Sequence, residues 1–275
     1  MRLAYTDVMR PSNFIRRLVL LSSLSLSAGA AAAEPVKLPA KEQLHLYLLI
    51  GQSNMAGRGV VEEQDKQAHP RVLKFTKENA WAPATDPLHY DKPTIAGVGL
   101  GSSFARVMAD ANPAATIGLI PCAVGGTPLS RWSKGGDLYQ QALERAQLAL
   151  KDGTLKGILW HQGEADSGSD RLAASYGERL GKMVNDFRAD LGAGEVPFVA
   201  GKLGEFLKRE DKDGKPSLRP LVNEQIGALP KSVASTAAVE STGLKPKSDN
   251  VHFDSPSLRE FGQRYAEAMK RLQAK

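Results

Sequence analysis

The stretch Leu44-His-Leu-Tyr-Leu-Leu-Ile-Gly-Gln-Ser-Asn-Met-Ala-Gly-Arg-Gly59 decides the fold class of this chain. Its apolar first part, residues 44–50, predicts a buried strand that ends at a glycine, and Ser53 follows two residues after that glycine. Such an arrangement places a hydroxyl at the carboxyl edge of a sheet, where open α/β folds bind their ligands. We therefore expect an α/β fold with Ser53 as a candidate nucleophile, although a serine after a glycine can also simply cap a helix.

Apolar runs and helical patterns alternate along the rest of the chain. Further strands are expected at residues 116–123, 157–160, 196–200 and 233–239, and helices at 101–110, 138–150, 172–191, 221–229 and 258–272. This alternation predicts a parallel sheet that is covered by helices on both faces. Residues 60–99 are expected to form an irregular insertion beside the active edge, because long connections in compact domains are often functional.

Residues 1–33 have the features of a secretory signal peptide. Two arginines precede the apolar run 18–26, and three alanines end the segment. The run is well short of the roughly 20 residues that span a bilayer, so we expect cleavage after Ala33 rather than a membrane anchor. Residues 34–41 then form a short tether, and residues 42–275 a single domain that is exported to the periplasm or secreted.

The composition and charge argue against nucleic acid as a partner. The 275 residues are 42% hydrophobic and 24% charged, as in ordinary globular proteins. Without the leader, which holds four arginines and one aspartate, the formal charge falls from +6 to +3, and no dense basic block remains. Nucleic acid is therefore not an expected partner. The single cysteine, Cys122, lies in an apolar run and is expected to be a buried residue rather than a nucleophile.

A candidate base lies near the other end of the chain, in the segment Asp249-Asn-Val-His252. A serine nucleophile needs a base within hydrogen-bond reach, and that base needs an orienting partner. His252 would accept the proton of the Ser53 hydroxyl and later protonate the leaving alcohol. Asp249 would bind the other imidazole nitrogen, and it completes a candidate triad.

Glu164 is an alternative acid, placed either to orient the imidazole instead of Asp249 or to pair with Arg58 or Arg131. Two carboxylates would also suit a glycosidase. That hypothesis leaves the serine and the histidine unused. The histidines have no third ligand at a diagnostic spacing, so no metal is expected.

Candidate oxyanion donors follow two other strands of the predicted sheet. Gly125 and Gly126 come after the run 116–123, and Gln162 comes after the strand 157–160. Since a tetrahedral intermediate needs preorganised donors, the amide of Ser53, an amide from the glycine pair and the Gln162 side chain are candidates. The alternatives are a plain tight turn at the glycines and a hydrogen bond between loops at Gln162.

Four blocks of sequence appear in order. They read Gly51-Gln-Ser-Asn-Met-Ala-Gly-Arg-Gly59, Pro121-Cys-Ala-Val-Gly-Gly-Thr127 with Trp132, Trp160-His-Gln-Gly-Glu-Ala-Asp166 and Asp249-x-x-His252. Together they resemble the sialate O-acetylesterase and acetylxylan esterase group, carbohydrate esterase family 6, of the SGNH-hydrolase superfamily. The similarity covers about residues 42–273.

The resemblance implies a flavodoxin-like three-layer α/β/α sandwich and removal of acetyl groups from carbohydrate without a metal or cofactor. It implies that Ser53 is the nucleophile and His252 the base. Asp249 is the favoured acid that orients His252, and Glu164 remains the alternative. The candidate substrate contacts are Gln52, Asn54 and Trp132. The aromatic candidates for stacking on sugar rings are Trp81, Tyr90 and Trp132, and the alternative for each is that it packs the insertion against the core.

The sequence thus predicts an exported serine esterase that deacetylates acetylated xylan, sialic acid or similar glycans through an acyl-enzyme. The expected partner is an acetylated sugar or polysaccharide, with no stable membrane anchor. Two alternatives remain: a non-catalytic carbohydrate-binding protein on the same fold, and a lipase or thioesterase of the same superfamily. The sequence does not fix the oligomeric state.

Overall fold

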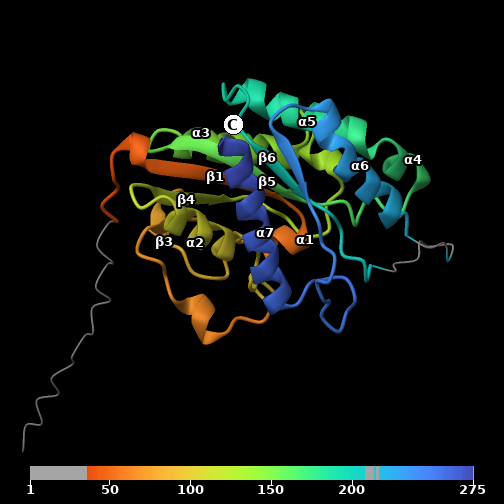
Figure 1. The fold of residues 1–275 in the computed structure, drawn as a ribbon, viewed down its shortest axis with the longest axis horizontal. Helices are drawn as coiled ribbons and strands as arrows, with labels where there is room; N and C mark the ends of the chain where they lie inside the picture. Colours follow the sequence, from red (N-terminus) through yellow and green to blue (C-terminus); the bar gives the residue numbers. More distant parts are fainter. Residues whose placement is uncertain (1–35, 208–213, 215–216, 275) are drawn as a thin grey trace, which may run out of the picture. The chain divides into compact units, whose positions relative to one another are not determined.

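The computed structural model describes residues 36–207, 214 and 217–274, and the predicted leader lies outside them. Seven strands of the described residues form one sheet in the order β3-β2-β4-β1-β5-β6-β7 (Figure 1). Neighbouring strands are parallel except for the antiparallel pair of β2 and β3 at one edge. The strands are β1 (Leu44–Gly51), β2 (Val72–Phe75), β3 (Trp81–Pro83), β4 (Thr116–Pro121), β5 (Thr154–His161), β6 (Phe198–Gly201) and β7 (Thr236–Val239).

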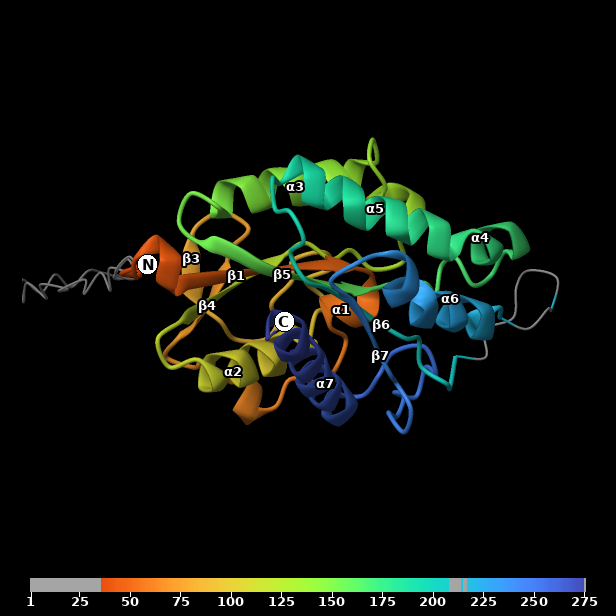
Figure 2. The same ribbon diagram turned by 45° about the horizontal axis from the view of Figure 1, so that its top comes forward.

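Helices cover both faces of this sheet (Figure 2). One face carries α2 (Gly101–Ala111) and α7 (Ser255–Gln273), and the other carries α3 (Asp137–Ala149), α5 (Tyr176–Asp190) and α6 (Arg219–Ser232). Two short helices, α1 (Ser53–Ala56) and α4 (Asp170–Ala174), and three 3₁₀ turns (Lys41–Gln43, Glu63–Lys66, Leu129–Trp132) complete the described elements. The predicted three-layer α/β/α sandwich is confirmed. None of the helices in the described part of the chain is both long enough and apolar enough to cross a membrane.

The central strand β1 explains why the opening stretch is so apolar. It pairs with β4 on one side and β5 on the other, so both of its faces are covered. Leu46, Leu48 and Ile50 point into the core under α3 and α5, and Tyr47 and Leu49 point into the core under α2 and α7. A strand buried on both faces is expected to be a continuous apolar run rather than an alternating one.

Gly51 ends β1 and sets the position of the serine. Its φ is +133°, and a Cβ at this position would lie 2.2 Å from the carbonyl oxygen of His161 on the neighbouring strand. Only glycine allows this close approach of backbone to backbone. The chain then turns directly into α1, whose first residue is Ser53.

Two expectations about secondary structure are wrong. The insertion at residues 60–99 contains the short strands β2 and β3, which extend the sheet beyond β4. The single helix expected at 172–191 is divided into α4 and α5 at Ser175, whose hydroxyl donates to the carbonyl oxygen of Arg171 at 2.9 Å. Serine often competes in this way for backbone hydrogen bonds.

Candidate active site

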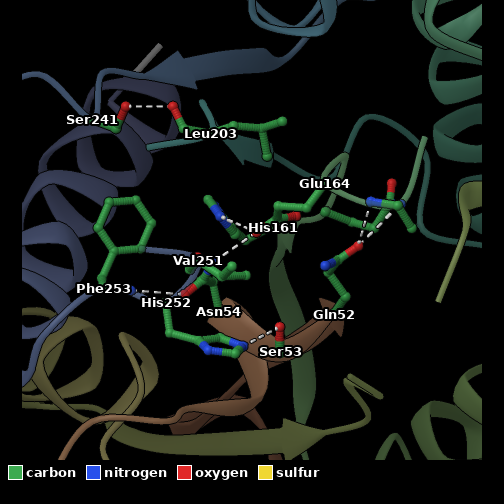
Figure 3. A network of polar contacts seen from close by, with 12 residues as sticks. Gln52, Ser53, Asn54, His161, Glu164, Leu203, Ser241, Val251, His252 and Phe253 are labelled. Carbon is green, nitrogen blue, oxygen red and sulfur yellow. Dashed lines mark hydrogen bonds and ion pairs between the residues drawn. The ribbon is translucent and has the colours of Figure 1, made fainter. Parts of the chain in front are cut away.

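Ser53 and His252, far apart in sequence, are in contact at the carboxyl edge of the sheet (Figure 3). Ser53 begins the turn after β1, and His252 lies in the loop between β7 and α7. The His252 Nε2 atom is 3.0 Å from Ser53 Oγ. This distance is within the hydrogen-bond reach that a base needs to take the proton of the hydroxyl.

Asp249 contacts the other side of the same imidazole. Its Oδ2 atom lies 2.8 Å from His252 Nδ1, and its Oδ1 atom accepts the backbone amides of Val251 and His252 at 2.9 Å each. Desolvation opposes the charged form of Asp249, but the hydrogen bonds from the His252 ring and these two amides lower its pKa to about 2. An ionised Asp249 accepts only, so Nδ1 carries the ring proton and Nε2 is left to accept from Ser53.

The Gly125–Gly126 turn lies beside the serine. A Cβ on Gly125 would be 3.3 Å from Ser53 Cβ, so this turn lies close to the serine and leaves no room for a larger residue. The Gly125 amide donates to Asp91 Oδ2 at 2.8 Å and is therefore already paired. Among the described residues the amides of Ser53 and Gly126 have no acceptor, so these two of the expected donors are available to an oxyanion.

Gln162, the third expected oxyanion donor, makes buried hydrogen bonds within the protein. Its side chain is 0% exposed, and its Nε2 atom donates to Asp166 Oδ2 at 2.7 Å and to the Thr127 carbonyl at 3.0 Å. An amide nitrogen carries two protons, so both are used within the protein. Gln162 therefore joins the loops behind the serine, which is the alternative role that the sequence left open for it.

Two residues near the glycine turn, Asp91 and His89, were not expected from the sequence. The Asp91 carboxylate pairs with Arg58 Nη2 at 2.5 Å as well as with the Gly125 amide, and the His89 Nδ1 atom accepts the amide of Ala123 at 3.1 Å. Desolvation works against the charged form of Asp91, but Arg58 and the Gly125 amide hold its pKa below the ordinary value. The insertion therefore fixes the turn at two backbone amides.

The side chains predicted as substrate contacts are mostly turned inward. Trp132 is 0% exposed, packs edge to face on Trp160 at 5.8 Å between ring centroids, and donates to Thr127 Oγ1 at 3.0 Å. Asn54 is 2% exposed and its amide is fully hydrogen-bonded within the protein. In this structure Trp132 and Asn54 are therefore buried, and their polar groups are paired within the protein.

Gln52 and the other two aromatic candidates also have roles within the fold. The Gln52 side-chain oxygen accepts from the Ala165 amide at 3.3 Å and shares a proton of Gln162 Nε2, also at 3.3 Å, with a nearer acceptor. Trp81 donates to Asp152, two residues before β5 begins, so its indole lies toward the opposite edge of the sheet from Ser53. Tyr90 is half-buried in the insertion, with the Lys74 ammonium 6.0 Å from its ring centroid.

Glu164 does not contact the imidazole of His252. Its Oε1 atom accepts from Asn54 Nδ2 at 2.6 Å and lies 3.5 Å from His161 Nε2. Desolvation raises the pKa of this buried carboxyl, but the contacts with His161 and Asn54 outweigh it and the pKa lies below the ordinary value. Of the expected arginine partners, Arg58 pairs with Asp91, while Arg131 pairs with Asp137 on the surface.

The single cysteine and the possible metal ligands also bear on the chemistry. Burial raises the pKa of the Cys122 thiol to about 11, which leaves almost no thiolate at neutral pH. Within residues 36–207, 214 and 217–274, no group of three or more His, Cys, Asp or Glu side chains could hold a metal ion.

A hydroxyl held against an aspartate-bound imidazole, at the carboxyl edge of a parallel sheet, is the arrangement of a serine hydrolase. The comparisons with known proteins define the class more closely. The family "Carbohydrate esterase, sialic acid-specific acetylesterase" matches residues 43–271. A protein of Arabidopsis thaliana named "Probable carbohydrate esterase" is 31% identical over 242 residues, which cover 81% of this chain and 89% of that protein.

Two solved structures are also similar to this chain. The X-ray structure of a protein from the same Arabidopsis locus has a TM-score of 0.75 and 28% identity, and the match covers 85% of this chain and 99% of that one. The crystal structure of NanS has a TM-score of 0.67 at 19% identity, with 86% and 99% covered. The chain belongs to the carbohydrate esterase, sialic acid-specific acetylesterase family, and it is a carboxylic ester hydrolase that acts on carbohydrate acetyl groups.

Proposed function

We propose that this protein removes O-acetyl groups from glycans through an acetyl-enzyme formed on Ser53. The observation that carries the proposal is the continuous contact from Ser53 Oγ through the imidazole of His252 to the carboxylate of Asp249, with distances of 3.0 and 2.8 Å. The family match supports an acetylated carbohydrate as the substrate.

In the first half of the reaction, Ser53 Oγ attacks the carbonyl carbon of the acetyl ester while His252 Nε2 takes the hydroxyl proton. The carbonyl oxygen becomes an oxyanion, and the amides of Ser53 and Gly126 donate to it. The intermediate collapses as the carbon–oxygen bond to the sugar breaks. His252 then gives its proton to the leaving sugar hydroxyl, and the acetyl group stays on Ser53.

In the second half, water enters the site that the sugar has left. His252 removes a proton from this water, the resulting hydroxide attacks the acetyl carbon, and Ser53 Oγ leaves with the proton that His252 returns. The product is acetate. Asp249 stays ionised throughout, because it stabilises the imidazolium without becoming protonated.

The test is acetate release from acetylated xylan, O-acetylated sialic acid and acetylated peptidoglycan, measured for wild type and Ser53→Ala. We expect release from at least one substrate by wild type and none above background by the variant. Equal rates for the two proteins would favour the non-catalytic binding protein. Faster turnover of long-chain acyl esters than of acetyl esters would favour a lipase or thioesterase.

We also propose that the protein is exported after cleavage of residues 1–33. The support is the arginine pair, apolar run and alanine end of that segment. Amino-terminal sequencing of the exported protein should begin at Glu34. Recovery of the intact chain from the cell interior would contradict export.

A further inference from the structure

The side chain of Asn54 joins the loop that carries the serine to the loop that carries the histidine. Its Oδ1 atom accepts the backbone amide of Phe253 at 3.1 Å, and its Nδ2 atom donates to the backbone carbonyl of Val251 at 3.2 Å. Val251 and Phe253 are the two neighbours of His252 in the chain. Asn54 therefore holds the backbone immediately before and after the catalytic imidazole (Figure 3).

Glu164, together with the Val251 carbonyl and the Phe253 amide, fixes which way the Asn54 amide points. A carboxamide can turn over and exchange its oxygen and nitrogen, and only one orientation offers an acceptor to the Phe253 amide. The Glu164 carboxylate accepts but does not donate, and its Oε1 atom takes the second Nδ2 proton at 2.6 Å. Since Asn54 and Glu164 are 2% and 4% exposed, water cannot readily replace this contact.

We infer that Asn54 and Glu164 are positioning residues for His252: the Glu164 carboxylate fixes the Asn54 amide, and that amide holds the His252 backbone so that Nε2 stays against Ser53 Oγ. The inference rests on the proposed esterase function of the same site. It gives the two acids of the family motif separate tasks. Asp249 acts on the imidazole ring, and Glu164 acts on the backbone around it.

The expected effect on catalysis is large although neither residue touches the reacting atoms. A displacement of about 1 Å in a reacting group can lower the rate about 100-fold. Removal of the Glu164 carboxyl leaves the second Nδ2 proton of the buried Asn54 without an acceptor, so the amide can shift and loosen its contacts with Val251 and Phe253. We expect Glu164→Ala to lower kcat about 10- to 100-fold with little change in KM.

We expect Glu164 to act through its hydrogen bond rather than through its negative charge. Glu164→Gln keeps an acceptor oxygen of the same length, so it should retain at least tenfold more kcat than Glu164→Ala. Asn54→Asp places two carboxylates against each other and should lose activity. The double variant Asn54→Asp/Glu164→Gln restores a donor–acceptor pair in the reversed sense, so it should recover part of that loss.

The experiment measures kcat, KM and melting temperature with p-nitrophenyl acetate for wild type, Ser53→Ala and these four variants. Asn223→Ala is a matched control, because Asn223 likewise accepts a backbone amide and donates to a backbone carbonyl, both of Leu203, but contacts neither Ser53 nor His252. It should lower the melting temperature without a comparable loss of kcat.

Provided that wild type is active and Ser53→Ala is inactive, three results would overturn the inference. Glu164→Gln could lose as much kcat as Glu164→Ala, which would show a direct role of the charge. Glu164→Ala could keep the wild-type kcat. The losses of kcat could simply follow the melting temperatures, with Asn223→Ala included. Inactive wild type would instead overturn the proposed function, and the positioning role with it.

Discussion

Replacement of Asp249 by asparagine should lower kcat about 10,000-fold. In the structure the carboxylate accepts the Nδ1 proton of His252 at 2.8 Å and two backbone amides at 2.9 Å. Asparagine can keep the two amides on its oxygen, which turns its NH₂ group toward Nδ1. The ring must then accept there and carry its proton on Nε2, the atom that faces Ser53 Oγ.

A proton on Nε2 prevents the imidazole from taking the proton of the serine. The same change of tautomer in another serine hydrolase lowers kcat about 10⁴-fold, which corresponds to about 5.5 kcal/mol of activation free energy. Because the loop keeps its two backbone hydrogen bonds, KM and the melting temperature should change little.

The assay is the steady-state hydrolysis of p-nitrophenyl acetate at pH 8, alongside thermal unfolding. Glu164→Gln serves as the comparison, since it replaces the other candidate acid by its amide. A kcat within tenfold of wild type for Asp249→Asn, with a large loss in Glu164→Gln, would refute the assignment of Asp249 as the orienting acid.

Other predictions follow from individual residues. Desolvation of the buried Asp86 raises its pKa from 3.8 to about 7, so folding favours its protonated form, and stability is lost as pH rises from about 4 to 7. Asp86→Asn should therefore be about 4 kcal/mol more stable than wild type at pH 8 and nearly equal to it at pH 4, by chemical denaturation; equal stability at pH 8 would contradict this. Trp132→Ala should cost about 3–5 kcal/mol of stability because the ring is fully buried, whereas Trp132→Phe should keep the KM for an acetylated glycan; a raised KM with unchanged stability would restore a substrate contact. Treatment with iodoacetamide at pH 8 should leave activity intact because the Cys122 thiol is protonated, and rapid inactivation that Cys122→Ser abolishes would argue against that.

The layers of the fold could be predicted because each depends on local patterns. The continuous apolar run of β1 is what a strand buried on both faces requires. The strands β2 and β3 were missed because they have only four and three residues, and their burial depends on the edge of β4. The break between α4 and α5 depends on one hydroxyl at Ser175, which a helical period does not reveal.

From the sequence, it could be predicted that the candidate residues lie together at one edge of the sheet. The sequence placed Ser53, the Gly125–Gly126 turn and Gln162 after successive parallel strands, and parallel strands bring their carboxyl ends to one edge. The directions of the side chains were not predictable. Trp132 and Gln162 follow those strands as expected, yet both turn inward, where their polar groups find buried partners.

The residues that fix the glycine turn could not be found from the sequence. Asp91 and His89 lie in the insertion, about 34 positions from the amides that they bind. No periodic pattern links such a pair. The one available signal was the length of the insertion beside the active edge, which suggested a role without naming residues.

The most direct test of the central claim is to find the acetyl group during turnover. An acid quench of wild type with an excess of p-nitrophenyl acetate, followed by peptide mapping by mass spectrometry, should find one acetyl group on Ser53. Continued turnover with the acetyl group on another residue, or with no acetylated peptide even when deacetylation is slowed, would contradict the nucleophilic role of this serine.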